Sequence, residues 1–156
     1  MLAEVTATPA LPRTCSVART LDIVGEKWAI LALREVFLGN RRFDDMIRRT
    51  GAPRDTFAQR LRTLTDAGIL ERRQYSDRPP RFEYHLTEAG ADLYPVITSL
   101  REWGDKYLAG DDGPPLVIEH NCGHVLSTRL TCEACGQVVS PRDTRPRRSR
   151  AGQEAS

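Results

Sequence analysis

The stretch from Arg41 to Leu86 constrains the fold most, because two short amphipathic helical patterns are followed directly by a hairpin pattern. Within each helical pattern, apolar residues recur at three- and four-residue spacing: Phe43, Met46 and Ile47 in the first, and Phe57, Leu61 and Leu64 in the second. The break between them, Thr50-Gly51-Ala52-Pro53, is so short that the helices must pack against each other at a steep angle. This pattern predicts a helix-turn-helix.

A β-hairpin is predicted after the second helix, which Gly68 ends. Two strand-like runs, 70–75 and 81–86, flank the segment Ser76–Pro80, and the second run alternates apolar with polar residues. Both prolines of that segment are expected in the loop, because proline cannot donate to a strand ladder. A hairpin in this position, with Arg78 near its tip, is typical of the wing of a winged helix.

Helices are predicted on both sides of this core. One begins with Ser16 as N-cap and ends at Gly25, and the next, Lys27 to Leu38, is apolar nearly all round and therefore buried. Arg41-Arg42-Phe43 can add a short strand. After the hairpin, a helix capped by Thr87 is predicted to run to Leu108 with a kink at Pro95. Its apolar stripe exceeds what the domain needs for closure, so we expect a two-fold dimer built from the first and last helices. The alternative is that both helices only cover the core of the monomer.

The fold class expected from these patterns is α+β, mostly α. We predict a disordered lead-in at 1–13, a winged helix-turn-helix domain at 14–109, a Cys/His-rich segment resembling a zinc ribbon at 116–141 and a basic disordered tail at 142–156. The hydrophobic share of 40% and the charged share of 28% are ordinary for a soluble protein. Since neither a membrane span nor a secretory signal is recognisable, we expect a cytoplasmic protein that binds no membrane.

Charge is distributed unevenly along the chain, although its net value is only +2. Residues 41–81 contain 11 arginines against six acids, whereas residues 82–140 contain three basic residues against nine acids. The preference for arginine over lysine is compositional, but composition does not explain this segregation. The positive block coincides with the predicted winged helix, where a polyanion such as double-stranded DNA would bind.

Placing the apolar stripe of the second helix inward turns its opposite side outward. This side, the first turn of the helix and the wing supply the candidate DNA-contacting residues: Arg54, Asp55, Thr56, Gln59, Arg60, Arg62, Thr63, Arg78 and Arg81. Gln59 can pair with adenine, and Arg54 or Arg62 with guanine. Asp55 could accept from cytosine N4 or only complement the helix dipole. Arg60, nearer the flank, can meet a phosphate or an internal acid, and the wing arginines a phosphate or the minor groove.

Several short fragments fall in one order along the chain: Cys15-Ser16-Val17-Ala18-Arg19-Thr20-Leu21, Gly25-Glu26-Lys27-Trp28, Arg41-Arg42-Phe43, Gln59-Arg60-Leu61, Gly68-Ile69-Leu70-Glu71-Arg72, Pro79-Pro80-Arg81-Phe82-Glu83-Tyr84-His85-Leu86-Thr87 and Glu102-Trp103-Gly104. Over residues 14–108 the chain thereby resembles HxlR-type bacterial transcriptional regulators. The resemblance implies a homodimeric winged helix-turn-helix that binds inverted-repeat operators and represses or activates nearby genes. Ser16 and Pro53 depart from the residues of many members, but proline is well accommodated in a first helical turn.

Cys15 and the C-terminal segment are the candidates for thiol or metal chemistry. Cys15 precedes a helix N-terminus, where the dipole favours a thiolate, and some members of the resembled family sense oxidants with a cysteine near this point. The alternative is a small buried residue in the dimer interface. Cys122, Cys132 and Cys135 with one histidine, His124 or the competing His120, would complete a tetrahedral zinc site. The alternative there is a small hairpin with reduced thiols and no metal.

Three classes of function follow. The first is a DNA-binding regulator, in particular a repressor, whose effector the sequence does not reveal. In a variant of this class, the regulator senses oxidants or metal ions through Cys15 or the Cys/His cluster. An enzyme is not expected, since three cysteines and one histidine would leave no open zinc position for substrate. A winged-helix adaptor that binds protein is the third, which the polar outer face of the second helix disfavours.

Overall fold

The computed structural model describes residues 15–147, and they form two compact units, one ending at Tyr94 and the other beginning at Pro95. The predicted lead-in at 1–13 and residues 148–156 of the predicted tail lie outside the described residues. None of the described helices is long and apolar enough to cross a membrane.

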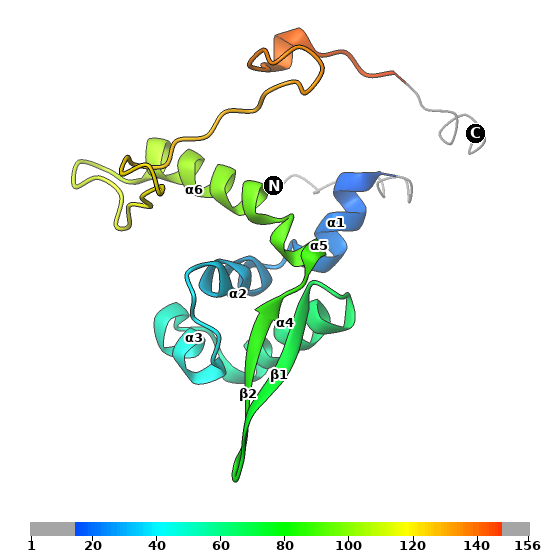
Figure 1. Ribbon diagram of the computed structural model, residues 1–156, viewed down its shortest axis with the longest axis vertical. Coiled ribbons are helices and arrows are strands. Elements are labelled where there is room, and N and C mark those ends of the chain that lie inside the picture. Colours follow the sequence, from blue (N-terminus) through cyan, green and yellow to red (C-terminus); the bar gives the residue numbers. More distant parts are fainter. Residues whose placement is uncertain (1–14, 148–156) are drawn as a thin grey trace, which may run out of the picture. The chain divides into compact units, whose positions relative to one another are not determined.

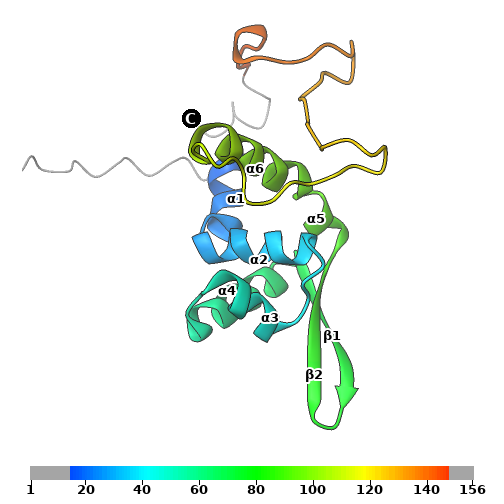
Figure 2. The same ribbon diagram turned by 90° about the vertical axis from the view of Figure 1, so that its left-hand side faces the viewer.

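The first unit is a winged helix. It contains α1 (Ser16–Val24), α2 (Lys27–Phe37), α3 (Phe43–Thr50), α4 (Arg54–Asp66), the antiparallel strands β1 (Leu70–Asp77) and β2 (Pro80–Leu86), and the short α5 (Glu88–Ala91). Both views show the hairpin projecting beyond the helices of this unit (Figures 1 and 2). The predicted helix-turn-helix and wing are thus confirmed.

Packing of α2, α3 and α4 follows from their apolar stripes. Phe57, Leu61 and Leu64 of α4 are fully buried, as is Met46 of α3, whereas Phe43 and Ile47 are half-buried. Completely buried side chains of α2 form the opposing surface of this core. Each such large side chain contributes about 1.5–3 kcal/mol by leaving water, so the core fixes the angle between the two helices.

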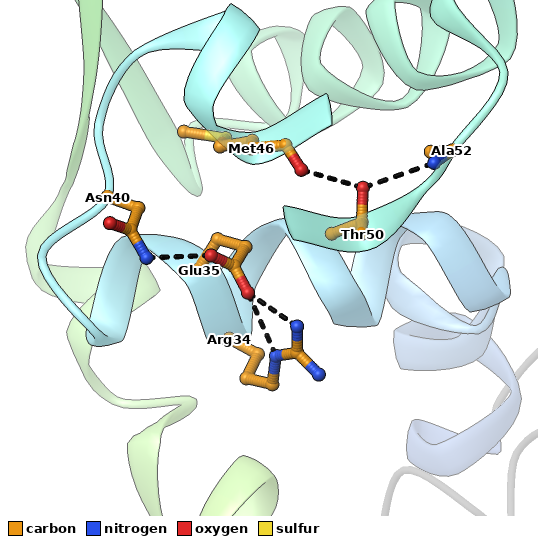
Figure 3. Close-up of polar contacts among 6 residues, drawn as sticks. All are labelled: Arg34, Glu35, Asn40, Met46, Thr50 and Ala52. Atoms are coloured by element: carbon orange, nitrogen blue, oxygen red, sulfur yellow. Dashed lines mark hydrogen bonds and ion pairs between the residues drawn. The ribbon is translucent and has the colours of Figure 1, made fainter. Parts of the chain in front are cut away.

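The turn between α3 and α4 satisfies its own polar groups. Gly51 ends α3 with a φ of 67°, a left-handed conformation that favours glycine. Thr50 Oγ1 donates to the Met46 carbonyl oxygen at 2.7 Å and accepts from the Ala52 N–H at 3.3 Å (Figure 3). Proline at position 53 then serves as the N-cap of α4.

One charged side chain, Glu35 of α2, lies inside this core with 1% of its surface exposed. Its Oε2 accepts from Asn40 Nδ2 at 2.7 Å, and its Oε1 accepts from the Arg34 guanidinium, whose Nε lies at 3.2 Å (Figure 3). The Asn40 N–H also donates to the Glu35 carbonyl oxygen at 2.9 Å. The carboxylate therefore ties the loop after α2 to the helix, directly before α3 begins.

The base of the wing is fastened to the end of α4. Thr87 Oγ1 caps α5 by accepting from the Gly90 N–H at 3.1 Å, and it donates to the Gly68 carbonyl oxygen at 2.6 Å. Gly90 packs so closely that a Cβ there would lie 2.1 Å from the Ile69 carbonyl oxygen. Both ends of the hairpin are thus held at one point, just beyond the second helix of the helix-turn-helix.

Three predicted boundaries are corrected. Cys15, and not Ser16, is the N-cap of α1, and no side chain caps this helix. The hairpin ladder extends to Asp77 and Pro80, with an irregularity between Gln74 and Ser76, because proline is tolerated as the first residue of a strand. The single helix predicted from Thr87 to Leu108 is two helices, α5 and α6 (Tyr94–Leu108). In a continuous helix the Pro95 ring would clash with the carbonyl four residues earlier, so the chain breaks before it.

In the second unit, α6 is followed by irregular chain with two short hairpin turns. Thr98 is buried on one side of α6, and Glu102 on this helix accepts from the Thr128 N–H at 2.8 Å and from its hydroxyl at 2.7 Å. A single turn of 3-10 helix, η1 (Pro141–Asp143), includes the first residues of the segment predicted as a disordered tail. There the Ser140 hydroxyl and N–H donate to Asp143 and lower the pKa of its carboxyl.

Candidate nucleic-acid interface

The outer side of α4 is free to meet a ligand. Because Phe57, Leu61 and Leu64 point inward, Asp55, Gln59 and Arg62 fall on the exposed side at the helical angle of 100° per residue. Thr56 and Thr63 are half-buried at its edges, and the Thr63 hydroxyl donates to the Gln59 carbonyl oxygen at 3.1 Å. The Gln59 amide and the Arg62 guanidinium form no hydrogen bond with other described residues, so both are available to base edges.

Arg54 is held at the first turn of α4 by residues of α3. Its Nη2 lies 2.8 Å from Asp44 Oδ1, and its guanidinium carbon lies 4.9 Å from the centre of the Phe43 ring. Both charged side chains are largely exposed, so this ion pair contributes little to stability. It does orient the guanidinium of Arg54. A phosphate or a guanine that binds this guanidinium would have to replace Asp44 as its partner.

Arg60 differs from the other candidates on α4. The residue is half-buried, and its Nε is buried with no hydrogen-bond partner among the described residues. An unpaired buried donor is costly, whereas the terminal nitrogens of the same side chain can still reach the flank of the helix. This placement suits a phosphate contact better than a base contact.

The wing carries the remaining two candidates, Arg78 at the tip and Arg81 at the start of β2, and both are exposed. Polar side chains brace the tip from within. Gln74 Nε2 donates to the Ser76 carbonyl oxygen at 3.1 Å and to Asp77 Oδ1 at 2.9 Å. Arg78 therefore lies on a turn that these hydrogen bonds hold in place.

An open groove of about 860 Å³ separates the start of α3 and one side of α4 from the hairpin. Half of the residues that line it are charged: Arg42, Arg62, Arg72 and Arg81, with Asp44, Asp45 and Asp66. Asp44 and Asp45 already pair with Arg54 and Arg48, so the unpaired charge facing the groove is mainly positive. A nucleic-acid backbone lying between α4 and the hairpin would meet this surface.

Arg42 and Arg72 were not among the predicted site residues. Arg42 pairs with β2 as a one-residue strand, its Nε lies 3.0 Å from Glu83 Oε1, and its guanidinium carbon lies 4.6 Å from the Tyr75 ring centre. The hydrogen bond to Glu83 raises the pKa of Arg42. The guanidinium carbon of Arg72 lies 3.5 Å from the centre of the Phe82 ring, so the two groups stack. The predicted strand at Arg41–Phe43 was the signal that could have placed Arg42 beside the wing.

The four cysteines are all free. Cys15 is half-buried at the start of α1, and its carbonyl oxygen accepts from the Arg19 N–H at 3.0 Å. In the second unit, the backbone N–H groups of Ala134 and Cys135 point at the Cys132 thiol and lower its pKa. Among the described residues, no three His, Cys, Asp or Glu side chains lie close enough together to hold a metal ion. Cys132 and Cys135 are brought together, but Cys122 and the histidines are not gathered around them.

The family comparison agrees with this geometry. The family model described as HxlR-like helix-turn-helix matches residues 23–112, which include the whole helix-turn-helix and the wing. The chain belongs to the HxlR-like helix-turn-helix family. The family resemblance seen in the sequence is thus confirmed, and the protein is a transcriptional regulator with a helix-turn-helix domain.

Curated relatives of this HxlR-like chain carry matching names. The HTH-type transcriptional regulator Rv3095 of Mycobacterium tuberculosis is 46% identical over 132 residues, which is 84% of either chain. The HTH-type transcriptional regulator YdeP of Bacillus subtilis is 40% identical over 96 residues, covering 60% of this chain and 73% of YdeP. Transcriptional regulators are not enzymes. The longer match to Rv3095 exceeds the span of the family model, so similarity continues outside the HxlR-like region.

Solved structures give the same fold. The crystal structure of PA1607, assigned as a transcription factor, matches with a TM-score of 0.78 and 29% identity over 88% of this chain and 96% of PA1607. The reduced form of the redox regulator HypR matches with a TM-score of 0.56 and 33% identity, covering 59% of this chain and 92% of HypR. This HxlR-like protein is therefore a winged-helix, DNA-binding regulator of transcription.

Proposed function

We propose that the protein is a sequence-specific repressor that binds inverted-repeat operators as a homodimer. The observation that carries the proposal is the exposed side of α4, where Gln59 and Arg62 stand free beside an arginine-lined groove. A helix of this width enters the major groove and reads base edges with such side chains. Repression needs no further surface, because a dimer seated on a promoter excludes polymerase. Such a role places the protein with the chromosome in the cytoplasm.

Each residue has a proposed role in the complex. Gln59 makes a bidentate pair with adenine, and Arg62 pairs with guanine. Arg54, Thr56 and Thr63 contact the edges of the same groove or its phosphates, and Asp55 accepts from cytosine or complements the dipole of α4. The arginines of the groove, together with Arg78, bind the phosphate backbone and give binding its salt dependence.

An apolar stripe on α6 supports the dimer. Its members follow one another at four- and three-residue spacing and are 45–59% exposed: Val96, Leu100, Trp103 and Tyr107. The opposite side of α6 is occupied by the chain that follows it, through Glu102 and Thr128. On α1, Val17 and Leu21 are likewise exposed one turn apart. Exposed apolar side chains spaced along one side of a helix mark an interaction site, and a second copy of the chain is the occupant that inverted repeats require.

Selection of bound fragments from random and genomic DNA tests the proposal directly. We expect a palindromic motif with half-sites about one helical turn apart, and a protein that sediments as a dimer at micromolar concentration. Recovery of fragments without a shared motif would reject sequence-specific binding. A single unrepeated half-site, bound by a monomer, would reject the dimer but keep the DNA-binding role. A promoter fusion carrying the motif then gives the sign of regulation.

Replacing Arg78 with alanine should weaken binding to all DNA sequences alike. The exposed guanidinium at the wing tip is proposed to neutralise a phosphate, so its loss removes affinity without removing base recognition. The measured slope of log K against log salt should become shallower by about 1 for each Arg78 lost from the contacts. Arg147→Ala, in the exposed C-terminal region, is the matched control. A sequence-dependent loss in Arg78→Ala would instead assign this residue to base reading.

A redox-responsive regulator is the alternative that one observation favours. Cys15 is only half-buried and directly precedes α1, and HypR, a neighbour in fold, is named a redox regulator. If Cys15 is the sensor, peroxide should change operator affinity at least several-fold in the wild type and leave Cys15→Ser unaffected. Equal affinities before and after peroxide in the wild type would dismiss the sensor and leave a packing role for this cysteine.

A further inference from the structure

The backbone of Arg42, which lines the groove between α4 and the hairpin, is fixed from two sides. Arg42 is the N-cap residue of α3, and its carbonyl oxygen accepts from the Met46 N–H at 3.0 Å. It also forms a β-bridge with Glu83, next to which the Tyr84 N–H donates to the Arg41 carbonyl oxygen at 2.8 Å. The Cα of Arg42 therefore moves only together with the start of α3 and the edge of β2.

The side chain of Arg42 is held as well. Its Nε donates to Glu83 Oε1 at 3.0 Å, and its guanidinium carbon lies 4.6 Å from the centre of the Tyr75 ring. Because a planar guanidinium is held both by a hydrogen bond and by a ring beneath it, rotation of the side chain is restricted. Among the described residues, no acid pairs with the other three arginines of the groove: Arg62, Arg72 and Arg81.

The hydrogen bond to Glu83 leaves the outer end of the Arg42 guanidinium available. Its Nη1 and Nη2 have no hydrogen-bond partner among the described residues, since only Nε is used. The Arg42 side chain is 54% exposed, whereas that of Glu83 is 23% exposed. Arg42 lines the groove and Glu83 does not, so the free NH₂ groups can bind two oxygens of one phosphate there.

The Glu83 carboxylate has no other hydrogen-bond partner among the described residues. Its Oε2 lies 3.6 Å from His85 Nε2, which is too long for a hydrogen bond. A carboxylate close to a surface that binds phosphate should by itself weaken binding, because like charges repel each other. An effect of Glu83 in the opposite direction would have to come from its contact with Arg42.

We propose that Glu83 is a positioning residue, which orients Arg42 so that its two terminal NH₂ groups bind one phosphate of the DNA backbone. The inference rests on the proposed binding of the backbone by the arginines of the groove. An arginine that is oriented before binding loses less side-chain freedom when the phosphate arrives, so its contact contributes more affinity. Glu83 should therefore strengthen DNA binding although it is itself negatively charged.

Substitutions of Glu83 distinguish positioning from charge repulsion, because the two effects have opposite signs. Glu83→Ala removes the negative charge together with the hydrogen bond, and we expect it to weaken DNA binding by about two- to fivefold for each copy. Glu83→Gln keeps an acceptor for Arg42 Nε without the charge, and it should bind at least as tightly as the wild type. Glu71→Ala, which removes an acid of the same hairpin that pairs with Arg73, should not weaken binding. Unchanged or tighter binding by Glu83→Ala would overturn the proposal.

Arg42→Ala separates positioning from damage to the hairpin. Its slope of log K against log salt should be shallower by about 0.9 for each copy, and Glu83→Ala should reproduce part of this change. In the Arg42→Ala background, replacing Glu83 with alanine should cost no further affinity. An equal loss with and without Arg42 would overturn the positioning role and assign Glu83 to the stability of the hairpin.

Fluorescence anisotropy with the selected palindrome and with a scrambled duplex of the same length measures these affinities. Phosphate contacts carry no base information, so the losses should be equal on both duplexes. A loss confined to the palindrome would overturn the phosphate contact. The scrambled duplex reports on Glu83 even if selection yields no shared motif, so failure of the positioning role and failure of the sequence-specific repressor are distinguishable.

Discussion

Replacing Gln59 with alanine should cost about 1–3 kcal/mol of operator affinity for each copy, and thus about 2–6 kcal/mol for a dimer bound to two half-sites. The exposed amide is proposed to donate to and accept from one adenine, and alanine can do neither. Preference for the base pair at that position should relax in both half-sites. Fluorescence anisotropy at one fixed salt concentration, with the operator and its single-base variants, measures both effects.

A matched substitution separates base reading from general damage. Gln137→Ala removes the same amide from the C-terminal segment and should leave operator affinity unchanged. The salt slope of Gln59→Ala should equal that of the wild type, because no phosphate contact is lost. If Gln59→Ala weakened binding to all sequences equally, or not at all, α4 would not enter the major groove in the proposed orientation.

Replacing Glu35 with alanine should lower the free energy of unfolding of the winged-helix unit by about 1–3 kcal/mol. The buried carboxylate accepts from Asn40 and from Arg34, and its removal leaves the Asn40 amide without its partner. The Arg34 side chain is 43% exposed, so water compensates it and the larger penalty of a stranded buried charge does not apply. Urea unfolding followed by far-ultraviolet circular dichroism gives the measurement.

Glu35→Gln and Glu26→Ala are the controls for this effect. Glutamine keeps the size of the side chain and an acceptor oxygen for Asn40, so it should cost less than alanine. Glu26 is exposed, and its replacement should change the free energy of unfolding by no more than about 0.5 kcal/mol. Equal stability of the alanine and glutamine variants would show that the hydrogen bond to Asn40 does not hold the loop before α3.

The winged helix could be predicted because its signals are local. Helical periodicity identified the buried side of α4 through Phe57, Leu61 and Leu64, and Gly51 and Gly68 marked the helix ends. The break before α6 was missed, because a proline can kink a helix or begin one, and the sequence pattern around Pro95 permits both. The burial of Glu35 was missed as well, since only the folded loop brings Asn40 to it.

The candidate site was predicted in part for the same reason. Gln59 and Arg62 could be placed on the outer side of α4 from one helix alone. Arg42 lines the groove through its contact with Glu83, 41 residues away, and Arg72 lines it through its contact with Phe82, which depends on the register of the hairpin.

The fastening of the hairpin at Thr87 limits how one subunit can adapt to different operators. The threonine hydroxyl joins the Gly68 carbonyl, at the end of α4, to the cap of α5. The hairpin and α4 are therefore fixed at the same residue and should move as one rigid body. An operator half-site of a different length would then be bound more weakly, because α4 and the hairpin cannot change their positions independently. Thr87→Ser would keep the hydroxyl and this rigid arrangement, whereas Thr87→Val would remove the hydroxyl and let the hairpin move relative to α4.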